Sequence, residues 1–225
     1  MSRIVQEAGS HGSLKNLQIL INNYPSLINR KICEKLQKDF RIEWKSPLAT
    51  DEYAEYRDND FLEIIEVQKK IKTPLNDFWP RNGPQWDALG RNDDSVFLVE
   101  AKANIPESVS SPCGACVESM ARIIDSLSEV KEYLNIRNEI DWSKTFYQYA
   151  NRIAHLYYLK VLNNIKTYMV FVYFINDKTV DGPIDENEWK GAIQVIEEYL
   201  GLNKRHKLSK YIVDIFIDVR EIGIA

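Results

Sequence analysis

The feature that most constrains the fold is a continuously apolar run, Met-Val-Phe-Val-Tyr-Phe-Ile at positions 169–175. The run is far shorter than the roughly 20 residues that a membrane-spanning helix needs. A strand without polar alternation must be covered on both faces, as the central strands of α/β proteins are. The sequence therefore predicts a strand at 168–175, inside a sheet with helices on both sides.

Apolar residues at helical spacing predict the elements that cover this sheet. The predicted helices are a pair within 13–40 that meets at Pro25, then 52–69, 117–134, 142–162 and 186–200. The other predicted strands are 75–79, 85–90 and 95–101, joined as antiparallel hairpins, and 211–219. We expect one α/β (α+β) domain over 1–225, with 1–45 as an N-terminal helical extension and the central order helix, three strands, helix, strand.

The composition is typical of a soluble domain, with 225 residues, 44% hydrophobic and 28% charged. Three cysteines are too few for a disulfide framework, and the first residues lack the apolar core of a secretory signal, so we expect a cytoplasmic protein. The formal charge of -4 argues against a protein that coats nucleic acid. Basic clusters at 69–72 and 204–210 are either phosphate contacts or solvated faces.

Three side chains with potential chemistry lie on two consecutive predicted strands: Asp87, then Glu100 and Lys102. Because alternate side chains of a strand share a face, Glu100 and Lys102 point the same way and Ala101 points to the other side. Magnesium prefers oxygen ligands and retains several waters. Asp87, Glu100 and the Ala101 carbonyl therefore form a candidate Mg²⁺ site. Lys102 would orient a water or stabilise charge on phosphorus during hydrolysis.

The segment from Gly83-Pro84-Gln85-Trp86-Asp87 to Glu100-Ala101-Lys102 resembles the PD-(D/E)xK nuclease superfamily, whose pattern is an aspartate, a spacer, and Asp/Glu-x-Lys on the next strand. Pro84 is not adjacent to Asp87, and the resemblance depends on the proline only loosely. It implies a restriction-endonuclease-like αβββαβ core, with a central mixed sheet flanked by helices. It also implies a nuclease that uses Mg²⁺, or Mn²⁺, on nucleic acid, with DNA as the expected substrate.

Two further residues follow from the resemblance. The superfamily often adds a glutamate from the helix before the strands, and Glu55 is our choice as that ligand and catalytic residue; a solvated acidic face is the alternative. Some subgroups carry a Gln-x-x-x-Tyr motif on the helix after the sheet. Gln148 matches its glutamine, and Arg152 replaces the tyrosine as a candidate phosphate contact. Polar residues three and four apart on this helix line either the catalytic side or a solvent face: Gln148, Asn151, Arg152 and His155.

Other residues have two interpretations each. Cys113 and Cys116 form a Cys-x-x-Cys pair, but a structural zinc site usually has four Cys or His ligands, which favours an ordinary loop-to-helix pair. The aromatic cluster of Phe78, Trp79 and Trp86 could stack on an unpaired base, and core packing is the favoured interpretation. His155 is expected to be a partly buried helix residue, not a general base.

The nuclease hypothesis has two rivals. One is a catalytically inactive module that keeps the nuclease-like fold to bind protein or nucleic acid, which the net acidity favours. The other is a metal-assisted or redox activity of the two paired cysteines. A nuclease that cuts both strands of a duplex commonly needs two sites, so a homodimer is a further expectation. Fold alone specifies neither sequence preference nor endonuclease against exonuclease action.

Overall fold

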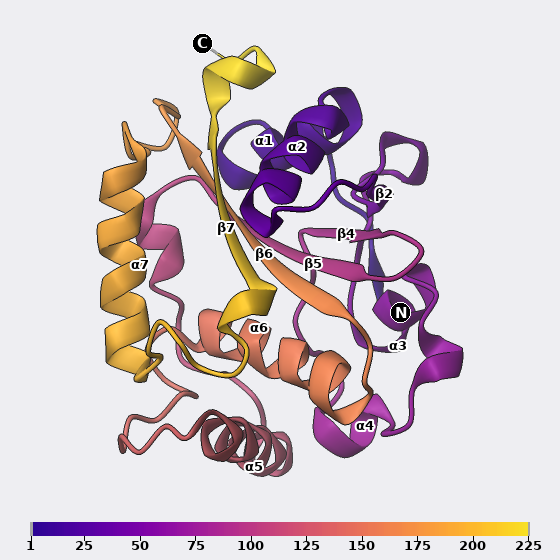
Figure 1. Ribbon diagram of the computed structural model, residues 1–225, viewed down its shortest axis with the longest axis vertical. Helices are drawn as coiled ribbons and strands as arrows, with labels where there is room; N and C mark the ends of the chain where they lie inside the picture. The colour runs from indigo at the N-terminus through magenta and orange to yellow at the C-terminus, as the bar shows by residue number, and fades with distance from the viewer. Residues whose placement is uncertain (1, 225) are drawn as a thin grey trace.

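The computed structural model describes residues 2–224 and contains a five-stranded sheet with the order β2-β4-β5-β6-β7 (Figure 1). The strands are β2 (Glu43–Ser46), β4 (Ala88–Arg91), β5 (Val96–Lys102), β6 (Thr167–Ile175) and β7 (Ile212–Asp218). β2, β4 and β5 pair antiparallel, whereas β5, β6 and β7 pair parallel. The protein therefore has a mixed α/β fold, with β5 at the junction between the two modes of pairing.

Alternating side chains of the central strands build a separate hydrophobic core on each face of the sheet. Phe97 and Val170 belong to the core on the side of α1 and α2, whereas Leu98 and Phe171 belong to the core on the side of α5, α6 and α7. Figure 1 shows α1 and α2 on one side of the sheet and α5 and α6 on the other. The helices are α1 (Gly12–Asn23), α2 (Pro25–Leu36), α5 (Val117–Leu134), α6 (Tyr147–Tyr157) and α7 (Glu186–Leu200). Both faces are covered, which explains why β6 has almost no exposed position and confirms the central strand predicted at 168–175.

Shorter elements connect these layers. They are β1 (Arg3–Ile4), β3 (Glu55–Tyr56), α3 (Asp58–Ile64), α4 (Leu75–Phe78), a π-helical turn (Tyr158–Leu162), and 3-10 turns at Ala49–Asp51, Gln68–Lys70, Ile105–Ser108, Ser209–Tyr211 and Val219–Ile222. β1 and β3 form a small antiparallel ribbon beside the main sheet. None of the helices within residues 2–224 is both long enough and apolar enough to cross a bilayer.

The helices predicted at 117–134 and 186–200 are confirmed with the same bounds. Local capping explains this agreement. The Asp185 side chain accepts hydrogen bonds from the first backbone amides of α7, and Gly201 ends that helix with φ 77°. Asn135 ends α5 in the left-handed conformation, with φ 58°. Where caps and periodicity agree, the sequence specifies the helix.

The single long helix predicted at 52–69 is wrong: within this range only α3, at Asp58–Ile64, is α-helical. Glu52, Tyr53 and Asp58 have φ values of 53°, 50° and 53°, which a right-handed helix cannot accommodate. Residues distant in sequence hold this segment in its observed form: Glu55 pairs with Ile4 in the β1–β3 ribbon, and Arg3 bonds Asp51 at 2.7 Å. Tertiary pairing therefore overrides the helical pattern.

The strand predicted at 75–79 is also wrong, because Pro74 precedes a helical turn, α4, that buries Leu75 and Phe78 three positions apart. The outer strand of the sheet is β2 instead. The segment 1–45 therefore contributes strand residues to the sheet in addition to its two helices, and those helices cover a face of the sheet. The helix predicted at 142–162 begins later, at Tyr147, because Phe146 has φ 61°.

The close pairing of β2 and β4 generates a stability prediction at Gly90. A Cβ there would lie 2.7 Å from Ile42 Cγ2 and 2.9 Å from a ring carbon of Trp44. We expect Gly90→Ala to lower the free energy of unfolding by about 1–3 kcal/mol, as overpacking does. Gly191→Ala in α7 is the matched control: a Cβ at Gly191 would have no neighbour within 4 Å, so the change should stabilise by about 0.5–1 kcal/mol. Urea unfolding measures both, and equal midpoints for the two variants would contradict the packing argument.

Candidate active site

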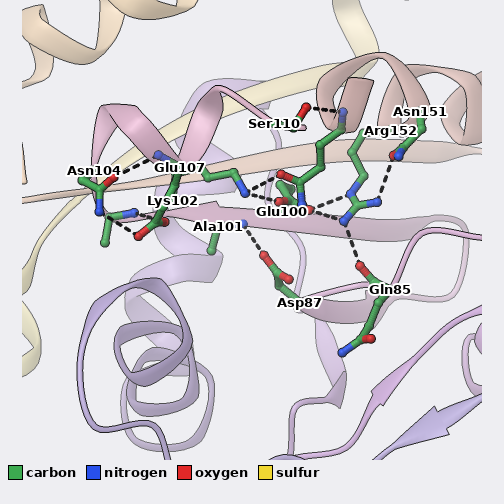
Figure 2. A network of polar contacts seen from close by, with 12 residues as sticks. Gln85, Asp87, Glu100, Ala101, Lys102, Asn104, Glu107, Ser110, Asn151 and Arg152 are labelled. Atoms are coloured by element: carbon green, nitrogen blue, oxygen red, sulfur yellow. Dashed lines mark hydrogen bonds and ion pairs between the residues drawn. The ribbon is translucent and has the colours of Figure 1, made fainter. Parts of the chain in front are cut away.

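The pairing of β4 with β5 brings the predicted carboxylates to one end of the sheet. Ala88 pairs with Val99, so Asp87, immediately before β4, lies beside the end of β5. The Asp87 Oδ2 atom accepts a hydrogen bond of 2.8 Å from the Ala101 backbone N–H (Figure 2). This bond fixes Asp87 against the strand that carries Glu100 and Lys102.

Glu100 is buried between two cations. The Lys102 ammonium lies 2.5 Å from Glu100 Oε1, and the Arg152 Nε atom donates to Glu100 Oε2 at 2.6 Å (Figure 2). The Glu100 side chain is 2% exposed and that of Arg152 is 3% exposed. Lys102 also donates to Gln148 Oε1 at 2.8 Å. Glu100 and Lys102 therefore share the face of β5 that meets α6, as the strand alternation predicts.

Arg152 is the residue that links the parts of the site. Its Nη2 atom donates to the Gln85 carbonyl at 2.8 Å, and its Nη1 atom donates to Asn151 Oδ1 at 3.0 Å. The guanidinium also stacks over the Trp86 ring, 4.7 Å from the ring centroid. A helix, a strand and the loop before β4 thus hold one side chain. The sequence placed Arg152 on the correct helix face but did not indicate its pairing with Glu100.

Glu55 reaches the site from a strand and not from the predicted helix. The bridge between Tyr56 and Trp86 sets β3 beside the segment before β4. The Glu55 Oε2 atom accepts hydrogen bonds from Gln6 Nε2 at 3.1 Å and from Gln85 Nε2. Its side chain is buried, so the alternative of a solvated acidic face is wrong.

The carboxylates of the site influence each other's protonation. Burial raises the pKa of Asp87 well above its usual range, and the charges of Glu100 and Glu55 raise it further. Asp87 keeps part of its surface open to solvent, which moderates the burial effect, yet the neighbouring carboxylates act in the same direction. Burial and Glu100 also raise the pKa of Glu55. Burial works in the same sense on Glu100, but Arg152 and Lys102 outweigh it and lower its pKa.

An open cleft of about 510 Å³ gives access to these groups. Glu55, Asp87 and Arg152 line it, together with neutral side chains from the loop before β4, from the loop 104–116 and from the start of α6: Asn82, Pro84, Gln85, Ser110, Tyr147, Gln148 and Asn151. A larger hollow of about 880 Å³ lies at the other end of the strands, around Lys166 and Tyr168, away from the carboxylates. The smaller cleft is therefore the one that contains Asp87 and Glu55.

The donor set suits a hard cation only in part. Within residues 2–224, the second oxygens of Asp87 and Glu55 accept no hydrogen bond. Oxygen donors on mutually repelling carboxylates are the ligands that Mg²⁺ prefers. The two oxygens of Glu100 are instead occupied by Lys102 and Arg152. Consistent with this, the described residues contain no group of three or more His, Cys, Asp or Glu side chains that could hold a metal ion.

The polar face of α6 points into the protein. Asn151, Arg152 and His155 are buried, and Gln148 is half-buried at the cleft, so the solvent-face alternative is wrong for this helix. The Gln148 backbone N–H donates to Ser110 Oγ at 2.9 Å, which ties the loop 104–116 to the start of the helix (Figure 2). Sequence reasoning missed Gln85 and Ser110, because neither lies in a periodic pattern that would indicate its partner.

The aromatic cluster and the two paired cysteines do not line the cleft. Phe78, Trp79 and Trp86 are buried, which confirms core packing. Cys113 and Cys116 are free thiols, the first half-buried against the core and the second exposed. Neither lines the cleft, and neither does the basic cluster 69–72 or 204–210. A phosphate contact at the cleft would therefore come from Arg152, which lines it.

Comparisons of the chain with protein-family models, with curated proteins and with solved structures found no match. The side chains themselves define what the site can bind. Its carboxylates attract a cation, and its lysine and arginine suit an anionic group such as a phosphate. The surrounding amides and hydroxyls of Gln148, Asn151 and Ser110 offer neutral hydrogen bonds to a polar ligand.

His155 generates a pH prediction. It is buried among four aromatic rings at centroid distances of 4.9–6.5 Å, and burial lowers its pKa to about 3. Its Nδ1 atom lies 2.9 Å from the Asn151 carbonyl, so it carries the proton of a neutral ring. An unfolded histidine has a pKa near 6.5, so between about pH 6.5 and 3 the unfolded state binds more protons, and stability falls with falling pH by up to about 1.4 kcal/mol per unit.

We expect His155→Gln to remove that contribution, since glutamine does not titrate in this window. The measurement is the free energy of unfolding of both proteins at several pH values between 4 and 8. The difference between wild type and variant should shrink or reverse as the pH falls below about 6.5. Curves that stay parallel over the whole range would show that His155 is protonated equally in both states.

Proposed function

We propose that the protein is a nuclease that hydrolyses phosphodiester bonds in DNA, with Mg²⁺ or Mn²⁺ as its ion. The observation that carries the proposal is the grouping of Asp87 and Glu55 at one cleft, beside the buried Glu100-Lys102 pair. Asp87 and Glu55 keep one oxygen each without a protein partner among residues 2–224, and Arg152 connects that cleft to Glu100. Carboxylates beside a buried lysine, open to solvent on one side, suit metal-assisted attack on phosphorus.

Each side chain has a distinct part in this chemistry. A bound divalent ion supplies a polarised phosphoryl oxygen and an acidified water. Asp87 and Glu55 would hold that ion through their open oxygens, with Glu100 and the Ala101 carbonyl as further ligands. Lys102, 14% exposed, would direct its ammonium toward the attacking water or the charge that builds on phosphorus. Gln148 restrains that ammonium by accepting its hydrogen bond.

The topology supports a restriction-endonuclease-like αβββαβ core. In chain order, α2 is followed by the antiparallel strands β2, β4 and β5, then by α5 and α6, and then by the parallel strand β6. Asp87 lies immediately before the second of these strands, Glu100 and Lys102 lie on the third, and Gln148 lies on the helix that precedes the fourth, whereas Glu55 lies on the separate strand β3. The helix that opens the core would be α2, in place of the segment 52–69.

One observation favours the alternative of a catalytically inactive module that binds protein or nucleic acid. Glu100 already has both oxygens in ion pairs with Lys102 and Arg152, so this carboxylate is neutralised without an added cation. In such a module the network would be purely structural. A nuclease that cleaves both strands of a DNA duplex would act as a homodimer, whereas an inactive module does not need to form a dimer.

The first functional prediction separates metal binding from structural pairing. Asp87→Asn removes a carboxylate that Glu100 and Glu55 repel, so without metal the variant should melt at or above the wild-type temperature at pH 7–8. Mg²⁺ at 100 times its Kd should stabilise the wild type by about 2.7 kcal/mol, or roughly 5–10 °C of Tm, and should not shift the variant. Asp125→Asn, at an exposed position of α5, is the control that keeps the shift. Identical melting of wild type and Asp87→Asn with and without metal would favour the inactive module.

The second functional prediction isolates the catalytic group. Lys102→Met keeps much of the stem volume and deletes the ammonium, so cleavage of single- or double-stranded DNA should fall by about 10²–10³-fold. Metal affinity should hold or rise, because a cation beside the carboxylates is removed. Lys166→Met, half-exposed at the far end of the sheet, should cut like the wild type. A Lys102→Met protein that keeps full activity would place any cleavage elsewhere in the molecule.

A further inference from the structure

Arg152 occupies the side of Glu100 that a metal ion would need. Its Nε and Nη2 atoms both contact Glu100 Oε2, and Lys102 contacts Oε1. Glu100 thus has no oxygen without a cationic partner. The two Arg152 contacts occupy both lone pairs of Oε2, so a metal ion can bind that oxygen only if Arg152 withdraws.

The geometry indicates which cation can withdraw. Lys102 projects from the strand that carries Glu100, two residues along, and is held there by Gln148. Arg152 projects from α6, and besides Glu100 it contacts only uncharged groups: the Gln85 carbonyl, Asn151 Oδ1 and the Trp86 ring. Arg152 also lines the cleft, whereas Lys102 does not. A guanidinium binds a phosphate with the same paired geometry that it uses for a carboxylate, so a phosphate in the cleft offers it an equivalent partner.

The net charge of the site also favours binding of the metal ion together with a phosphate. A bound divalent cation would favour the ionised forms of Glu55, Asp87 and Glu100, and these three carboxylates with Lys102 and Arg152 sum to one net negative charge. A divalent cation alone would turn this into one net positive charge in a largely buried space. A phosphodiester brings one negative charge and restores neutrality. The net charge of the site is zero with both ligands bound and positive with the metal ion alone. Uncompensated charge in a buried space is unfavourable.

We propose that Arg152 is a displaceable counter-ion of Glu100, which makes the site bind its divalent cation tightly only together with a substrate phosphodiester. The inference rests on the proposed nuclease function and deepens it, because it names the coupling between ion and substrate. With no substrate, Arg152 blocks Glu100. With a phosphodiester in the cleft, the guanidinium contacts the phosphate and Glu100 becomes available as a ligand. Coupling of this kind between two ligands is reciprocal.

The test measures binding of Mn²⁺ to the wild-type protein by titration, alone and with two oligothymidylates. One is a phosphorothioate, which keeps the negative charge and resists hydrolysis; the other is a methylphosphonate, which is neutral. We expect the phosphorothioate to tighten Mn²⁺ binding by about 5–150-fold, and the methylphosphonate to leave it unchanged. Equal Mn²⁺ affinity in all three conditions would overturn the proposal, and this arm needs no variant.

The second arm uses Arg152→Met, with Arg152→Lys as the charge-retaining variant. Arg152→Met should bind Mn²⁺ alone more tightly than the wild type, by about 10-fold or more, and should lose most of the gain from the phosphorothioate. Arg152→Lys should keep weak binding and part of the gain. Arg122→Met is the matched control, because Arg122 is exposed on α5 and bonds only the carbonyls of Asn76 and Asp77. Weaker Mn²⁺ binding by a folded Arg152→Met protein would contradict a blocking role.

Cleavage of DNA by the wild type distinguishes this inference from the function on which it rests. If the wild type cleaves DNA but the phosphorothioate does not change its affinity for Mn²⁺, the nuclease function stands and the proposed role of Arg152 is rejected. Absence of both cleavage and Mn²⁺ binding, even with the phosphorothioate present, would reject the two together.

Discussion

The arrangement of the site depends on one buried carboxylate, Glu100, held between Lys102 and Arg152. An ion pair removed from water is stable only when its desolvation is offset by close geometry and additional hydrogen bonds. Here Gln148, Asn151 and the Gln85 carbonyl supply those bonds. Loss of either cation would leave charge buried without compensation, so the sheet, α6 and the loop before β4 must keep their relative positions. The network therefore fixes the architecture around the cleft as well as its charge.

The change of pairing at β5 explains why these groups meet. β4 pairs antiparallel with β5, which places Asp87 beside the end of β5. β6 is parallel to β5, so the chain must return across the sheet before β6 begins, and α5 and α6 make that return. The start of α6 consequently lies over the end of β5. Asp87, Glu100 and Gln148 come together because a hairpin and a crossover connection share one strand.

The same charges that suit the site for a cation and a phosphate are unfavourable for the folded protein. Asp87 and Glu55 have raised pKa values because they are removed from water near Glu100. Groups whose environment opposes their charge are a common mark of functional sites, since a purely structural core would replace them with apolar residues. His155 differs, because it is neutral inside an aromatic cluster and satisfied by a backbone carbonyl. Burial is therefore common to both kinds of residue; Asp87 and Glu55 differ from His155 in that they line the cleft, each with an oxygen that accepts no hydrogen bond within residues 2–224.

The sequence by itself determined the elements whose signals are local. Apolar runs specified β5 and β6, and periodicity with caps specified α5 and α7. The alternation of a strand placed Glu100 and Lys102 on one face. Only the tertiary structure decided the rest. Glu55 lies on a strand because residues near the N-terminus pair with it, and the outer strand comes from 43–46 because it pairs with β4. The partnership of Arg152 with Glu100 spans 52 positions. Contacts over such distances depend on how whole elements pack, and no short pattern in the chain records them.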